Sequence, residues 1–186
     1  YAQAAQRMLP GGGDPELQNI LSYIIQDDHR AAEVIQRLRS LLKKTRPEMK
    51  PVDINTLINE TIVLITTDAV VRNISFKLEL RSNLPLISGD RIQLQQVLLN
   101  LISNSFDALE NNKGSREISI RTTLKDSDTI MVAVKDSGYG IPVENMPKLF
   151  TNFFTSKPDG LGMGLAISRS IVESHGGRLY VENNPG

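Results

Sequence analysis

Apolar side chains recur at intervals of three, four or seven residues over the first part of the chain. Their positions are Leu17, Ile20, Leu21, Ile24, Ala31, Ile35, Leu38 and Leu42. This spacing predicts one long helix with a single apolar face, and Asp14 followed by Pro15 is typical of its start. Residues 1–9 predict the tail of an earlier helix that ends at Pro10. Two helices alone cannot bury such a face, so residues 1–46 predict a helical hairpin that dimerises into a four-helix bundle.

The pattern changes after Pro47 and Pro51, which indicate a linker over residues 47–52. A second domain is predicted over residues 53–186. Its predicted helices cover residues 55–68, 90–111 and 162–175, and its predicted strands cover residues 74–81, 116–124, 129–136 and 178–183. The polar run at 125–128 joins two of these strands into a predicted hairpin. This mixture predicts an α+β fold, an α/β sandwich with three helices on one face of a mixed sheet.

Composition excludes several classes of site. The 186 residues include no cysteine, so there is no disulfide, cysteine-bound zinc or thiol nucleophile. Lys+Arg and Asp+Glu are 21 each, a balance that predicts no nucleic-acid partner. His29 and His175 are the only histidines, which argues against a histidine metal site. No apolar stretch approaches the ~20 residues that span a bilayer, so no membrane contact is predicted.

The predicted helix at 90–111 is apolar around most of its circumference but carries one polar row. That row consists of Gln93, Gln96, Asn100, Asn104, Asp107 and Asn111. Most of these side chains are amides, and asparagine is a poor helix former. Asn100 and Asn104 lie one turn apart, and amide oxygens suit Mg²⁺. A solvated helix face and a metal site therefore both remain open.

Two glycine-containing segments follow. Asp136, at the end of a predicted strand, precedes Gly138 and Gly140; this is either a tight turn or a carboxylate that accepts a hydrogen bond from an exocyclic amine such as adenine N6. Gly160 to Leu165 opens a helix, where free N–H groups and the helix dipole favour phosphate.

Between the glycine segments lie Phe150, Phe153 and Phe154, a predicted small aromatic core, and then Lys157. The lysine supplies a cation that we expect to face the phosphates. No glycine-rich run ending in Lys-Ser or Lys-Thr is present, so the chain is not a P-loop protein.

In this order the segments resemble the ATP-binding domain of sensor histidine kinases, in the GHKL superfamily. QLQQVLLNLISNSFDAL resembles its N box, DSGYG its first glycine box, FTNFFTSK its F box and GLGMGLAISRSIVESHGG its second glycine box. The resemblance covers roughly residues 51–186, and residues 1–46 resemble the end of the dimerisation hairpin.

The resemblance implies ATP and Mg²⁺ as cofactors. It makes Asn104 the metal ligand, Asn100 its partner near the phosphates, Asp136 the adenine-reading group and residues 141–159 the ATP lid. The implied catalytic residues are Asn100, Asn104 and Lys157. The implied nucleotide-binding residues are Asn104, Asp107, Asp136, Gly138, Gly140, Ile141, Lys157, Gly160, Leu161, Gly162, Met163, Gly164 and Leu165.

The residue at position 100 bears on the reaction. Hydrolysing relatives carry glutamate four residues before the metal-binding asparagine, whereas this chain has Asn100. An amide cannot take a proton from water, so phosphoryl transfer to a histidine is the favoured activity. A GHKL-type ATPase, a serine-directed kinase and a dimerisation module with a vestigial site are the alternatives.

His29 departs from the family's phosphoacceptor pattern, because it lies on the second predicted helix and no proline follows it within a few positions. We therefore expect the phosphoacceptor histidine before Tyr1 and the last strand of the sheet after Gly186, so that this fragment cannot phosphorylate itself. The resemblance implies a homodimer through the N-terminal helices and a response-regulator receiver domain as partner. A cytoplasmic location is expected from the need for ATP and the absence of cysteine.

Overall fold

The computed structural model describes residues 48–110, 112, 114–126, 128–157 and 160–184, together with four helical positions, Leu17, Ile20, Leu21 and Ile24. The chain divides into two compact units, Tyr1–Thr45 and Arg46–Gly186. Apart from those four positions, the helices predicted for residues 1–46 lie outside the described residues, as does His29. The four-helix bundle and the dimer therefore stay predictions.

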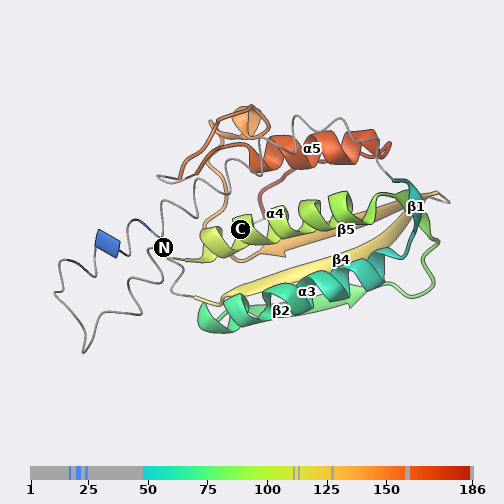
Figure 1. Ribbon diagram of the computed structural model, residues 1–186, viewed down its shortest axis with the longest axis horizontal. Coiled ribbons are helices and arrows are strands. Elements are labelled where there is room, and N and C mark those ends of the chain that lie inside the picture. Colours follow the sequence, from blue (N-terminus) through green and yellow to red (C-terminus); the bar gives the residue numbers. More distant parts are fainter. Residues whose placement is uncertain are drawn as a thin grey trace. The chain divides into compact units, whose positions relative to one another are not determined.

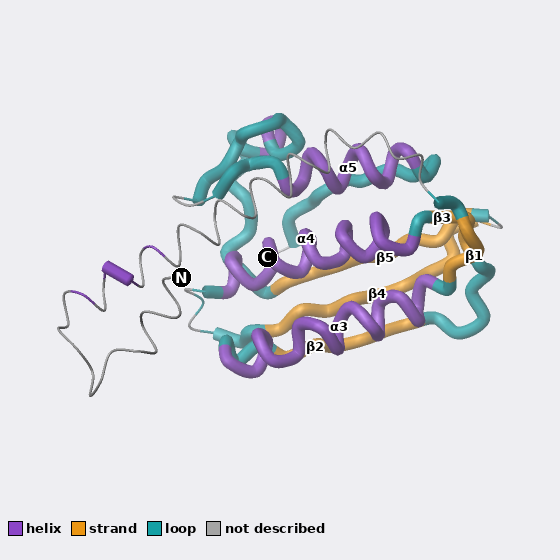
Figure 2. Tube along the Cα trace, viewed as in Figure 1, coloured by secondary structure: helices purple, strands orange, loops and turns teal. Residues whose placement is uncertain are grey.

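The second unit is an α+β sandwich. Its elements are β1 (Lys50–Val52), α3 (Ile54–Val71), β2 (Ser75–Leu80), β3 (Ile87–Gly89), α4 (Arg91–Leu109), β4 (Glu117–Asp126), β5 (Thr129–Asp136), the short 3-10 helix η2 (Met146–Lys148) and α5 (Gly164–Ser174). Strands β2, β4 and β5 form a mixed sheet, parallel between β2 and β4 and antiparallel between β4 and β5. Helices α3 and α4 lie along one face of it, with α5 beside α4 (Figures 1 and 2). The predicted fold class is confirmed.

The core forms where α3 and α4 cover the sheet. Alternate residues of β4 point inward: Ile118 and Ile120 are fully buried, and Thr122 is nearly so. They are covered by Leu57 and Ile58 of α3 and by Ile102, Phe106 and Leu109 of α4. Each such aliphatic or aromatic side chain contributes about 1.5–3 kcal/mol when fully buried. This burial holds α4 firmly on the sheet.

Helix α3 is long and apolar enough to cross a membrane by length and composition, so the expectation that no apolar stretch approaches that length is wrong. In this fold it is a core helix, because Leu57, Ile58 and Thr61 are buried between it and the sheet. Its outward face exposes other apolar side chains, among them Val63 and Leu64.

Polar contacts join the start of α4 to the end of α5. Asp90 caps α4 by accepting hydrogen bonds from the backbone N–H groups of Ile92 and Gln93. The backbone N–H of Asp90 donates to Nε2 of His175, 2.9 Å away. The Nδ1 atom of His175 lies 2.7 Å from the carbonyl oxygen of Ile171. The histidine thus bridges the end of α5 and the start of α4.

Two sequence predictions are wrong in detail. The linker predicted at 47–52 contains β1, which pairs with β3. Residues 178–183 form no strand; Tyr180 and Asn184 instead donate side-chain hydrogen bonds to Met131 Sδ and to the Asp136 carbonyl. Asparagine side chains compete for backbone partners, and here they take the place of a backbone ladder.

Asp90 links stability to pH. Burial by itself raises the pKa of its carboxyl group, but the hydrogen bonds from the backbone N–H groups of Glu48, Gln93 and Ile92 outweigh burial. The pKa therefore lies below its ordinary value of 3.8. A carboxyl group whose folded-state pKa is lowered stabilises the fold above its unfolded pKa and loses that contribution as the pH falls through the folded value.

We predict that Asp90→Asn lowers the free energy of unfolding at pH 7 by about 0.3–1 kcal/mol, because asparagine also caps a helix but carries no charge. Urea unfolding at pH 7 and at pH 2.5 measures this. The difference between variant and wild type should be smaller at pH 2.5, because the contribution of the charged carboxyl group is lost as the pH falls below its ordinary pKa of 3.8 and through the lowered folded-state value. An equal difference in the free energy of unfolding at the two pH values would contradict a stabilising role for the Asp90 charge.

Candidate functional site

One face of α4 contacts three segments that are distant in sequence. Asn100, in the middle of the helix, donates through Nδ2 to the carbonyl oxygen of Gly164 and to Oγ of Ser168, each at 3.3 Å. Both acceptors belong to the first turns of α5, and Ser168 is fully buried. Asn100 therefore ties α4 to the start of α5.

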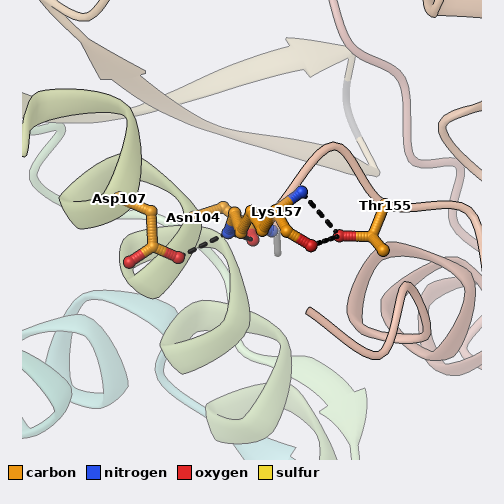
Figure 3. Close-up of polar contacts among 4 residues, drawn as sticks. All are labelled: Asn104, Asp107, Thr155 and Lys157. Atoms are coloured by element: carbon orange, nitrogen blue, oxygen red, sulfur yellow. Dashed lines mark hydrogen bonds and ion pairs between the residues drawn. The ribbon is translucent and has the colours of Figure 1, made fainter. Parts of the chain in front are cut away.

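One turn further along α4, a lysine from the predicted lid reaches the polar row (Figure 3). The Lys157 ammonium donates to Oδ1 of Asn104 at 3.0 Å and forms an ion pair with Asp107. The backbone N–H of Lys157 donates to Oγ1 of Thr155, 3.0 Å away, which fixes the turn that carries the lysine. A cation thus lies against the amide oxygen for which the sequence predicts Mg²⁺.

The loop after β5 meets the last turn of α4. Gly138 packs so closely that a Cβ there would lie 2.8 Å from the Ala108 side chain and from its carbonyl oxygen. The Gly138 N–H donates to Oδ1 of Asp136 at 2.9 Å, which orients the carboxylate. No described residue forms a hydrogen bond with the second carboxylate oxygen of Asp136, which leaves it as an acceptor.

The glycine-rich segment before α5 packs against the backbone of Phe153 and Phe154. The Phe153 side chain is exposed, so the predicted small aromatic core does not include it. Gly162 has φ +63°, and a Cβ on it would lie 2.4 Å from the backbone of Phe153. Gly160 packs on Thr155 and Lys157, so the glycine-rich segment contacts the last described residues of the predicted lid. Met163 is buried, with 2% of its surface exposed, and its side chain belongs to the interior.

The structure thus brings most of the predicted residues to one side of α4. Asn100 contacts α5, Asn104 and Asp107 contact Lys157, and Ala108 adjoins Gly138. Leu161 and Leu165 are half-buried beside the α5 start. Gly140 and Ile141 contact a different residue, Asn183.

A cavity of about 200 Å³ lies elsewhere, between the ends of α3 and α4. It is lined by Arg72, Ile74, Phe106, Leu109, Glu110 and Arg116. None of these is a predicted site residue. The Arg116 guanidinium there donates to the backbone carbonyls of Asn112, Arg72 and Glu110, a structural role.

Sequence reasoning missed three asparagines that hold the 136–141 loop. Asn112 donates to the carbonyl of Ser137, Asn184 to that of Asp136, and Asn183 pairs with the backbone of Ile141. Their sequence signal is weak, because asparagine is common in turns of any kind.

Comparison with known proteins identifies the class. The family profile described as histidine kinase-, DNA gyrase B- and HSP90-like ATPase matches residues 89–186. The sensor protein FixL of Bradyrhizobium diazoefficiens is 35% identical over 187 residues, which cover 99% of this chain and 37% of FixL. The chain also spans 18% of another curated relative, the sensor histidine kinase TmoS of Ectopseudomonas mendocina.

Solved structures agree. The catalytic domain of the histidine kinase ThkA aligns with a TM-score of 0.65 and 34% identity over 74% of this chain and 89% of that one. ThkA in complex with the response regulator TrrA aligns with a TM-score of 0.75 and 29% identity over 98% of this chain and 52% of that one. The chain belongs to the histidine kinase-, gyrase B- and HSP90-like ATPase family, as a catalytic domain of the sensor histidine kinase type. The resemblance drawn from its sequence motifs is confirmed.

We predict that Asn100→Ala destabilises the fold by about 1–3 kcal/mol, because it removes two hydrogen bonds and leaves the Ser168 hydroxyl buried without this partner. Urea unfolding measures the loss. In a double-mutant cycle with Ser168→Ala, the two losses should not add. Additive losses would mean that the 3.3 Å contact does not couple α4 to α5.

Proposed function

We propose that this chain binds Mg²⁺-ATP along the polar row of α4 and transfers the γ-phosphoryl group to a histidine, as the ATP-binding core of a sensor histidine kinase. The observation that carries the proposal is the convergence on one helix face of Asn100, Asn104 and Asp107 with the lid lysine, the start of α5 and the Asp136 loop.

The residues present fit a magnesium ion. Asn104 offers an amide oxygen and Asp107 a carboxylate, both of them hard donors of the kind Mg²⁺ takes together with phosphate oxygens. The Lys157 ammonium already contacts both groups, so this position accepts positive charge. In the proposal Asn104 is the metal ligand, and the bound ion would neutralise charge on the phosphates.

The chain's own groups divide the remaining work. The free oxygen of Asp136 accepts a hydrogen bond from the exocyclic amine of adenine. Gly138 has no side chain, so the backbone can approach the base. The first N–H groups of α5 are directed toward phosphate, as at other helix N-termini. Lys157 exchanges its contact with Asn104 and Asp107 for one with the phosphates when the lid closes.

Position 100 favours transfer over hydrolysis. The Asn100 side chain is a neutral amide whose N–H groups are already donated to α5. It therefore cannot act as a general base for water. A GHKL-type ATPase or a serine-directed kinase is the alternative activity, and steady phosphate release abolished by Asn100→Ala would favour the ATPase.

The proposal for the whole protein combines the apolar spacing of residues 17–42 and the need for ATP with one solved complex of a relative. We infer a helical dimerisation hairpin over residues 1–46, a homodimer formed through it and a cytoplasmic location. ThkA in complex with TrrA supports a response-regulator receiver domain as partner. We propose a phosphoacceptor histidine other than His29, on a longer form of the protein.

Asp136→Ala tests the binding site. We expect ATP affinity, in the presence of Mg²⁺, to fall by at least about tenfold, because a hydrogen bond to a charged acceptor contributes about 1.5–3 kcal/mol. Calorimetric titration measures affinity, and ATP should raise the melting temperature of the variant less than that of the wild type. The matched control is Asp128→Ala, which changes an exposed aspartate in the β4–β5 turn.

Unchanged ATP affinity in Asp136→Ala would mean that the base is recognised elsewhere. Absence of any shift in the wild type would instead favour the vestigial dimerisation module.

The phosphoacceptor assignment has its own test. We predict that the chain incubated with Mg²⁺ and γ-labelled ATP gives no acid-labile phosphoryl group on His29, because the sequence around it lacks the phosphoacceptor pattern. Peptide mapping, with His29→Ala as the control, measures this. Label on His29 would overturn the assignment.

A further inference from the structure

The 136–141 loop, which follows β5, is held at both ends by two consecutive asparagines. Asn184 donates through Nδ2 to the Asp136 carbonyl at 2.8 Å. Asn183 accepts from the Ile141 N–H through Oδ1 and donates to the Ile141 carbonyl through Nδ2, each at 2.8 Å. Both asparagines lie in the irregular segment after α5, more than 40 residues from the loop in sequence.

The Asn183 contact replaces a strand neighbour. Its amide satisfies both backbone groups of Ile141, as the facing residue of a ladder would. Gly140 makes room for it: a Cβ there would lie 3.1 Å from Oδ1 of Asn183, and φ is +72°. The second glycine of the DSGYG motif therefore fits the asparagine as well as the turn.

The loop is also anchored from the side of α4. Asn112 donates to the carbonyl of Ser137 at 2.7 Å, and the Ser137 hydroxyl donates to the carbonyl of Ser115. Between these anchors lie the Asp136 carboxylate and the Gly138 N–H that orients it. A loop already held in its binding geometry loses less conformational freedom when a ligand binds.

We propose that Asn183 and Asn184 are positioning residues for base recognition, which hold the 136–141 loop in the arrangement from which Asp136 reads an exocyclic amine. This inference rests on the proposed function, because it takes Asp136 as the base-reading group. The asparagines act through the loop backbone and not on the nucleotide. Their loss should weaken selection of the base and leave the contacts of α5 and Lys157 with phosphate intact.

The test compares ATP and GTP affinities in the presence of Mg²⁺. Asn183→Ala should lower ATP affinity by about tenfold, as expected for two lost hydrogen bonds, with GTP affinity unchanged. The ATP:GTP affinity ratio then falls by the same factor. Asn184→Ala should lower this ratio less, because the substitution removes only one hydrogen bond. The matched control is Asn59→Ala, at an exposed asparagine of α3, and it should keep the wild-type ratio.

The ratio separates positioning from stability. A lower melting temperature with the wild-type ATP:GTP ratio in both variants would make the asparagines merely structural and overturn the inference. If Asn183→Ala unfolds at the assay temperature, Asn183→Asp, which keeps the acceptor for the Ile141 N–H, takes its place, and an unchanged ratio again overturns it.

Asp136→Ala in the same titrations distinguishes failure of the positioning role from failure of the proposed function. Loss of ATP binding there, with wild-type ratios in the asparagine variants, rejects the positioning role alone. Unchanged ATP binding in Asp136→Ala rejects the base assignment of the proposed function, and the positioning role with it.

Discussion

The structure depends on helix α4, which contributes both to the hydrophobic core and to the candidate binding site. Most of the circumference of α4 packs on the sheet, α3 and α5, with Ile102 and Leu109 essentially inaccessible to solvent. The polar row of Asn100, Asn104 and Asp107 is the part left to chemistry. A helix packed on several sides cannot rotate about its axis, so the hydrophobic core sets the directions of these side chains. The lid lysine and the start of α5 contact this row, and the β5 loop packs beside it on Ala108.

The α4–α5 pair shows how polar contacts complete that arrangement. The carbonyl of Ile171 can only accept and the N–H of Asp90 can only donate, so His175 is the neutral tautomer with its proton on Nδ1. It ties the end of α5 to the start of α4, and Asn100 ties the start of α5 to the middle of α4. With both ends fixed, the N–H groups at the start of α5 are held beside the polar row.

Hydrophobic periodicity predicted the helices and strands that are long enough to show a repeating pattern along the chain. Strand β5 has the predicted bounds, and α4 differs from its prediction by one or two residues at each end. Strands β1 and β3 were missed because three residues are too few to show alternation. The strand expected at 178–183 does not form, and the contacts of this part of the chain come from side chains, among them Tyr180, Asn183 and Asn184.

For the site, motif order supplied the candidate residues but not their contacts. Lys157 was expected to face phosphate, and here it lies on Asn104 and Asp107, about fifty residues away in sequence. Contacts at that separation are set by the fold and leave no periodic trace. The same holds for Asn183 and Asn184, whose contacts with the 136–141 loop arise only in the folded chain.

Position 100 connects structure with reaction type. A glutamate there would direct negative charge at the Gly164 carbonyl, and it could not donate the two hydrogen bonds that Asn100 donates to α5. The amide therefore stabilises the α4–α5 contact at the position where a hydrolase needs a proton acceptor. Exchanging a base for a structural donor removes the means to activate water and retains the means to hold phosphate. A protein built in this way suits a nucleophile that needs no deprotonation by residue 100, and a neutral imidazole meets that requirement.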